Sequence, residues 1–332
     1  MCFQILIILI FKNQSIKSFV SSYRIRKVLK LVFLVAVFVL LYRQITNLTL
    51  SKSLLLKIIH TLEGNLAYFL AAIALLFLNY FFEILKWNLL TKQVQARTFR
   101  QSTIDVLKGL RVGLFTPLML GDFLGRSVGF QKKNRTEVMA LNFFNSVCQT
   151  YVTLLFGSVA ILFWWIISED RLHNLLIVPV LIFILVSILG FLFVFRLKIS
   201  WQFLERINFI KPYLQTSVLG LNINNKFRIG ILALSIARTL VYNVQFWLFY
   251  VSLGIHLPIL VLFIGVNLIL LVKTVGGGLN IFGDLTLREF ISINFFGLYH
   301  VEGSLILIAT FVVWLFNIFL PVLIGFFIKP KE

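Results

Sequence analysis

Long runs of apolar residues restrict the fold of this chain more than any other feature. Seven runs follow one another along the 332 residues, and each is long enough, or nearly so, to cross a bilayer as a helix. They cover residues 28–42, 66–90, 138–167, 172–195, 229–253, 258–272 and 304–328. Because lipid offers the backbone no hydrogen-bond partner, these runs must be helices. The sequence therefore predicts an all-α polytopic membrane protein.

Composition and charge support this class and argue against others. The chain is 60% hydrophobic and only 13% charged, whereas a soluble domain carries about 25% charged residues. Its net charge of +19 comes from Lys and Arg placed mostly between apolar runs, which is typical of cytoplasmic loops and does not indicate nucleic-acid binding. The two cysteines lie far apart and the four histidines occur singly, so we expect neither a metal site nor a cofactor.

Two apolar stretches, 103–130 and 274–297, are broken by Gly, Pro and paired charges. The distribution of Lys and Arg places both termini in the cytoplasm, which requires an even number of crossings. We therefore expect residues 277–297 to supply an eighth transmembrane helix and residues 103–130 to enter and leave the membrane on one side. The predicted location is an inner or plasma membrane.

The expected domain organisation is simple. Residues 1–27 form a basic N-terminal segment, of which 1–11 are apolar but too short to span. Residues 28–328 form a single transmembrane domain, and residues 329–332 form a cytoplasmic tail. The longest polar connection, within 196–226, is expected to lie on the cytoplasmic membrane surface as an amphipathic segment.

The two broken stretches share a pattern: glycines, then Gly-Asp, then an arginine four residues after the aspartate. The pairs are Asp122 with Arg126 and Asp284 with Arg288, and at this spacing the two side chains face each other on a helix. Broken helices in both halves of a membrane protein indicate a transporter-like binding site, because free backbone groups at the break can face an anion. Breaks that serve only packing are the alternative.

Other polar residues lie within the apolar runs. Glu83 and Arg238 are expected to be functional, since an intramembrane charge requires a partner. Asn79 lies on the same helix face as Glu83 and Lys86, and Lys86 is expected to reach the interface beside Trp87. For the Asn and Gln residues of the third, fifth and sixth runs, helix–helix hydrogen bonding and a functional role both stay open: Asn142, Asn145, Gln149, Asn243, Gln245 and Asn267.

These motifs carry a family resemblance. Residues 113–126, Gly-Leu-Phe-Thr-Pro-Leu-Met-Leu-Gly-Asp-Phe-Leu-Gly-Arg, resemble the first signature of the flippase-like family named for the transmembrane region of lysylphosphatidylglycerol synthase. Residues 276–289, Gly-Gly-Gly-Leu-Asn-Ile-Phe-Gly-Asp-Leu-Thr-Leu-Arg-Glu, resemble its second signature. The likeness covers about 28–328. The chain departs from the family where apolar residues follow Pro117 in place of a basic one, and where Asp122 replaces a glutamate.

The resemblance implies an eight-helix bundle with re-entrant elements that moves an amphipathic lipid between leaflets. It also implies a stand-alone flippase-like domain without lipid synthesis, so we expect no enzymatic activity. The expected partner is a membrane lipid with an anionic or phosphate-bearing headgroup, and a homo-oligomer is left open. The candidate substrate-binding residues are Thr116, Pro117, Asp122, Arg126, Arg238, Gly277, Asp284, Arg288, Glu289 and Glu83.

Two alternatives remain at this stage. The chain could be a non-transporting accessory protein of lipid or cell-envelope glycan synthesis, or a membrane transferase that uses Asp122 or Glu83 as a base. The sequence contains no HExxH or GxSxG motif and no Ser/His/Asp grouping on adjacent segments, which favours transport over catalysis.

Overall fold

The computed structural model describes residues 52–114, 116, 120–167, 177–195, 224–275 and 281–327. All regular secondary structure in these residues is helical, which confirms the predicted all-α class. The first apolar run, the basic N-terminal segment, the proposed surface segment before residue 224 and the C-terminal tail lie outside the described residues.

The observed helices follow the predicted runs closely. The largest differences are α3, which no apolar run predicts, and the division of the stretch 103–130 into two helices. The helices are α3 (Lys52–Gly64), α4 (Leu66–Thr91), α5 (Phe99–Leu114), α6 (Leu120–Ser127), α7 (Arg135–Ile167), α8 (Ile177–Phe195), α10 (Asn225–Ser252), α11 (Ile259–Val275), α12 (Ile281–Gly297), α13 (Gly303–Trp314) and α14 (Leu320–Phe327).

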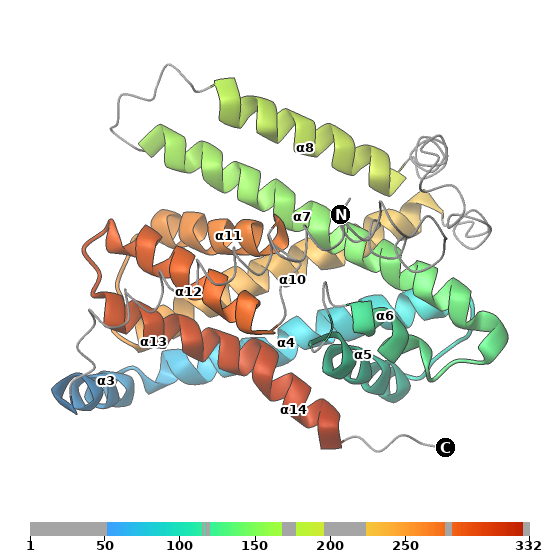
Figure 1. Ribbon diagram of the computed structural model, residues 1–332, viewed down its shortest axis with the longest axis horizontal. Coiled ribbons are helices and arrows are strands. Elements are labelled where there is room, and N and C mark those ends of the chain that lie inside the picture. The colour runs from blue at the N-terminus through green and yellow to red at the C-terminus, as the bar shows by residue number, and fades with distance from the viewer. Residues whose placement is uncertain are drawn as a thin grey trace, which may run out of the picture.

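Helix length and outer surface both fit a bilayer. Within the described part of the chain, four helical segments are long and apolar enough to span a membrane: Leu66–Thr91, Lys132–Ile167, Asn225–Ser252 and Gly303–Phe327. Helix α8 packs mainly on α7 and lies at the edge of the bundle (Figure 1). Its exposed side chains are apolar and include Leu181, Leu185 and Ile188. A helix that is apolar all round and sits at the edge of a bundle is stable only where lipid covers it. The chain is a multi-pass membrane protein.

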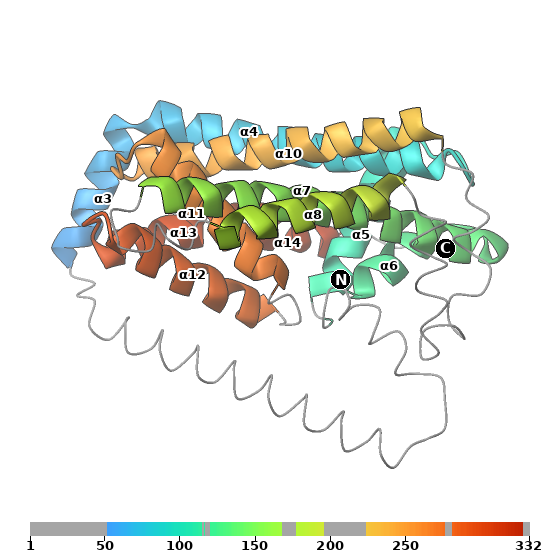
Figure 2. The same ribbon diagram turned by 90° about the horizontal axis from the view of Figure 1, so that it is seen from above.

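Helices α4 and α10 pack side by side along the bundle, with α7 against both (Figure 1). Two shorter antiparallel pairs, α5–α6 and α11–α12, lie toward opposite ends of the long axis in both views (Figures 1 and 2). Each pair contains one of the two broken stretches singled out in the sequence. The breaks themselves fall largely outside the described residues, at 115–119 and 276–280.

The glycines of the first broken stretch have a different role from the one we predicted. Gly109 and Gly113 lie within α5, and Gly121 and Gly125 lie within α6, so they do not break the helices. A Cβ on Gly121 would lie 2.4 Å from the carbonyl oxygen of Val112, and one on Gly125 would lie 2.6 Å from that of Lys108. The glycines allow the backbones of α5 and α6 to approach closely, as small residues do between membrane helices.

Replacing Gly125 with alanine is therefore expected to destabilise the α5–α6 pair. The new Cβ would overlap backbone atoms of α5 that cannot rotate away, at a cost of about 1–3 kcal/mol. Thermal unfolding of the purified protein in detergent measures the loss. The matched control is Gly230→Ala on α10, where a Cβ meets nothing within 4 Å. Equal unfolding temperatures for the two variants would contradict this packing role.

The last long helix contains a wider turn in its middle. Residues Leu315–Phe319 form a π-helical turn, η6, between α13 and α14. Such turns insert one extra residue and often occur at functional sites. Here the turn lies beside α4: the Tyr80 hydroxyl donates to the carbonyl oxygen of Asn317 over 2.7 Å.

Candidate functional site

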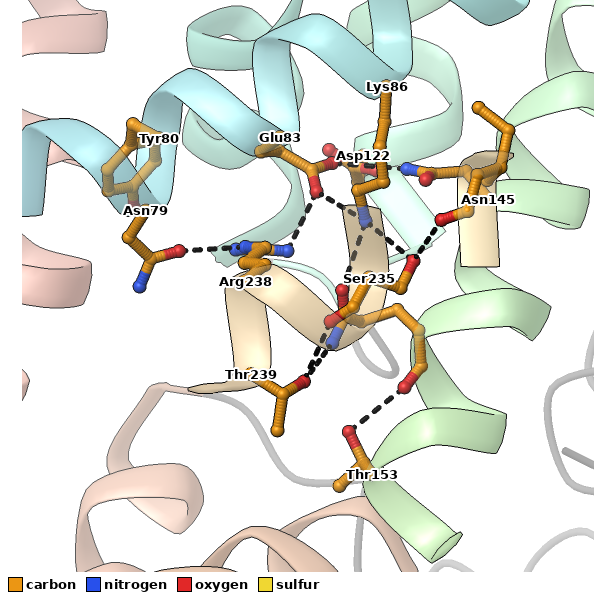
Figure 3. Close-up of polar contacts among 12 residues, drawn as sticks. Asn79, Tyr80, Glu83, Lys86, Asp122, Asn145, Thr153, Ser235, Arg238 and Thr239 are labelled. Carbon is orange, nitrogen blue, oxygen red and sulfur yellow. Dashed lines mark hydrogen bonds and ion pairs between the residues drawn. The ribbon is translucent and has the colours of Figure 1, made fainter. Parts of the chain in front are cut away.

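Glu83 on α4 is the centre of a buried ionic network (Figure 3). Its Oε1 accepts from the guanidinium of Arg126 at 2.9 Å and from the Asn145 amide at 3.1 Å. Its Oε2 lies 3.1 Å from Lys86 Nζ and 2.7 Å from Arg238 Nη1. One carboxylate thus joins side chains from four helices: α4, α6, α7 and α10.

The predicted pair of Asp122 and Arg126 forms and is part of the same network. Arg126 Nε lies 2.9 Å from Asp122 Oδ1, and Asn142 on α7 donates to Asp122 Oδ2 over 2.9 Å. The Arg126 guanidinium also lies over the Trp87 ring, 5.2 Å from its centroid, in a cation–π contact. The close α5–α6 packing positions this pair, because Gly109 faces the Asp122 and Arg126 side chains directly.

Lys86 does not extend to the interface, and that expectation was wrong. Its side chain is fully buried and donates to Gln149 over 3.0 Å and to Ser235 over 3.3 Å. Helices α7 and α10 cover this face of α4, so the ammonium finds partners inside the bundle. A buried lysine is stable only when its charge is paired and hydrogen-bonded, and Glu83 supplies the pairing.

Arg238 is the most accessible cation of this network. Its side chain is 26% exposed, compared with 5% for Arg126 and none for Lys86. It donates to the Asn79 amide oxygen over 2.8 Å. Asn79 in turn contacts Asn317 in the π-helical turn over 3.5 Å. Arg238 therefore connects the buried charges to the partly exposed edge of the network and, through Asn79, to the last helix.

The network is not electrically balanced. Three cations, Lys86, Arg126 and Arg238, face two carboxylates, Glu83 and Asp122. Among the described residues of the network, one positive charge is left over. Uncompensated charge is costly in a low-dielectric interior, so the arrangement favours an anion close to its accessible cation.

A second, smaller cluster surrounds Asp284 at the start of α12. Lys273 Nζ at the end of α11 lies 3.0 Å from Asp284 Oδ1, and Arg288 Nη2 lies 3.3 Å from Oδ2. Arg288 also donates to the Tyr242 hydroxyl on α10. The predicted pair of Asp284 and Arg288 is thus present, and Lys273, with a side chain that is 32% exposed, is its accessible member.

The two clusters adjoin each other. Tyr242, whose hydroxyl accepts from Arg288, lies one helical turn after Arg238 on α10. Helix α10 therefore connects the two clusters, each of which has one partly exposed cation. Both predicted Asp–Arg pairs form, and Arg238 belongs to the first cluster.

The remaining candidate residues have different surroundings. The Thr116 hydroxyl accepts from the Gly121 amide over 2.7 Å and donates to the Gly113 carbonyl over 2.9 Å, so it joins the end of α5 to the start of α6. Glu289 is buried, and neither of its carboxylate oxygens has a hydrogen-bond partner among the described residues. Pro117 and Gly277 lie outside the described residues.

The Asn and Gln residues left open by the sequence separate into two groups. Asn142, Asn145 and Gln149 on α7 contact the charged network. The others connect helices: Asn243 and Asn267 bond to each other between α10 and α11, and Gln245 donates to the Ala72 carbonyl on α4.

Sequence reasoning missed the roles of Lys273, Tyr242 and Asn317. The signal for Lys273 was available, because a lysine closing an apolar run just before a Gly-rich break is placed to meet the next acidic residue. Tyr242 and Asn317 gave no such signal. Tyrosine and asparagine in apolar helices are ordinary, and their contacts depend on the packing of distant helices.

The geometry agrees with the resemblance in the signatures, since both Gly-Asp stretches contribute ion pairs to adjoining clusters. The sequence model of the lysylphosphatidylglycerol synthase TM region matches residues 27–325. The chain belongs to this family. As a member of the lysylphosphatidylglycerol synthase TM region family, it is an integral membrane protein of lipid metabolism or transport. Neither the curated proteins nor the solved structures that were compared with the chain gave a match.

Proposed function

We propose that this protein moves a lipid with a phosphate-bearing headgroup between the two leaflets of the cell's inner membrane. One observation carries the proposal: Arg238 and Lys273 are the partly exposed cations of two buried clusters that α10 connects, and the cluster of Arg238 has an excess positive charge. Guanidinium and ammonium groups are the usual partners of phosphate oxygens. The headgroup would pass through this polar interior while the acyl chains stay in lipid.

The ion pairs can exchange partners without leaving a carboxylate alone. When Arg238 turns to a phosphate, Glu83 keeps Lys86 and Arg126 as partners. When Lys273 turns to the same phosphate, Asp284 keeps Arg288. Orphaning a buried charge would cost several kcal/mol, at least about 3. Redundant pairing avoids this cost and makes the accessible cations available to a passing headgroup.

The same contacts argue against catalysis by Glu83 or Asp122. All four of their carboxylate oxygens already have cationic or amide partners. A general base needs a free oxygen within reach of the proton that it removes. We therefore propose binding and movement of lipid rather than a transferase reaction, with both termini on the cytoplasmic side as the charge distribution indicates.

The test uses the full chain reconstituted in liposomes with a fluorescent phospholipid and an added quencher. Arg238→Gln should abolish most lipid movement, because it removes the excess charge while every carboxylate keeps a cationic partner. Arg238→Lys should restore part of the activity, since it keeps the charge. Arg100→Gln, at an exposed position on α5, is the matched control and should behave as wild type.

Two results would contradict the proposal. Wild-type protein that moves no phospholipid points instead to the accessory role in lipid or glycan synthesis. Wild-type and Arg238→Gln proteins that move lipid equally well show that the charged site is not the path of the headgroup. Unfolding temperatures measured on the same preparations distinguish a folded variant that no longer transfers lipid from a variant that is unfolded.

A further inference from the structure

Glu289 is a buried carboxyl group that the proposed path does not use. It lies on α12 next to Arg288 and is only 6% exposed, yet neither carboxylate oxygen has a hydrogen-bond partner among the described residues. The nearby Ser292 hydroxyl donates instead to the Arg288 carbonyl over 2.7 Å. A carboxylate that has left water without a partner is among the costliest groups to bury, whereas a carboxylic acid is not.

Helix α12 packs mainly against α11 and α13, and Tyr242 connects it to α10. Helix α10 contributes Tyr250, whose hydroxyl lies 2.6 Å from the Thr310 hydroxyl of α13, and Tyr242, which binds Arg288. Helix α11 contributes Lys273, which pairs with Asp284. The sequence of α13 contains no charged residue. Arg288 is the neighbour of Glu289 in the sequence, and its guanidinium is directed to Asp284 and Tyr242.

We infer that Glu289 is a proton-binding site that controls the charge of the Lys273–Arg288 cluster. With a proton on one of its oxygens, Glu289 is neutral, and two cations face the single carboxylate of Asp284. After that proton returns to water, the new carboxylate balances the cluster and competes for Arg288. The protonated form therefore favours an anionic ligand at Lys273, and the ionised form favours its release.

This coupling rests on the proposed function, whereas the proton site itself does not. The proton on Glu289 and an anionic headgroup at Lys273 favour the same state of the cluster, so each should raise the affinity for the other. The transfer of a phosphate-bearing lipid should therefore slow as the pH rises through the range in which Glu289 loses its proton, by up to about tenfold per pH unit for one linked proton.

The proton site is tested by infrared spectroscopy of the full chain in liposomes as the pH is varied. Wild-type protein should show the carbonyl band of a buried carboxylic acid, which Glu289→Gln lacks and Glu289→Asp shifts. Glu302→Gln is the matched control, because Glu302 contacts the Ser304 hydroxyl outside this cluster, and it should keep the band. Wild-type and Glu289→Gln spectra that are identical at every pH would overturn the inference.

Lipid transfer in the same liposomes tests the coupling. Wild-type transfer should fall as the pH rises, and Glu289→Gln, which resembles the protonated form, should transfer lipid at a rate independent of pH. The same pH dependence in both proteins would refute the coupling. No transfer by wild type at any pH would refute the proposed function and the coupling together, while the infrared band would still establish the proton site.

Discussion

Replacing Glu83 with glutamine is expected to destabilise the protein strongly. The variant keeps the shape of the side chain but leaves Lys86, Arg126 and Arg238 facing Asp122 alone. Removing one partner of a buried ionic network costs about 3–5 kcal/mol, because the remaining charges are not solvated. Unfolding in detergent by heat or denaturant measures the loss.

A double-mutant cycle makes this expectation specific. Arg238→Gln in the Glu83→Gln background removes one of the uncompensated cations, so the two changes together should cost less than the sum of each alone. Glu63→Gln is the matched control, since Glu63 is exposed on α3 and contacts only the exposed His60 among the charged groups described. Additive losses would show that Glu83 and Arg238 do not stabilise each other.

Replacing Arg288 with methionine should also cost about 3–5 kcal/mol, because Asp284 would keep only the partly exposed Lys273. Tyr242→Phe removes one hydrogen bond from the same guanidinium and should cost roughly 1 kcal/mol or somewhat more. Arg100→Met, at an exposed site, serves as the control for the loss of an arginine. The measurement is again unfolding in detergent.

The order of stability of these three variants tests which partner of the Arg288 guanidinium matters most. Arg288→Met should be the least stable, Tyr242→Phe intermediate and Arg100→Met equal to wild type. If Tyr242→Phe were as harmful as Arg288→Met, the tyrosine would be the main partner of the guanidinium and the pair with Asp284 would be secondary.

Sequence reasoning located the helices well because the signal for them is local. The run 66–90 became α4, and the run 229–253 became α10, each within a few residues. The pairs Asp122–Arg126 and Asp284–Arg288 could be predicted equally well from the sequence, because side chains four residues apart on a helix lie next to each other. Helix α3 was missed because its lysines, histidine and glutamate interrupt the apolar pattern.

The assembly of the site could not be read in the same way. Glu83 meets Arg126 across 43 residues and Arg238 across 155, and only the packing of α4 with α6 and α10 decides these contacts. The same packing determined that Lys86 is buried, although its place near the end of an apolar run suggested the interface. The role of the glycines was predicted wrongly for a related reason. Glycine occurs both where a helix breaks and where two helices approach closely, and the sequence does not distinguish the two cases.

The extra residue in the last helix determines which side of that helix faces the bundle. An α-helix turns by about 100° per residue, so without the π-helical turn at Leu315–Phe319 every side chain of α14 would be rotated by that angle relative to α13. As the chain stands, Gly325 faces the carbonyl oxygen of Leu107 on α5, where a Cβ would lie only 2.8 Å away. A single inserted residue thus sets the rotation of α14 about its axis, so that the last helix packs against α12 through α13 and against α5 through α14.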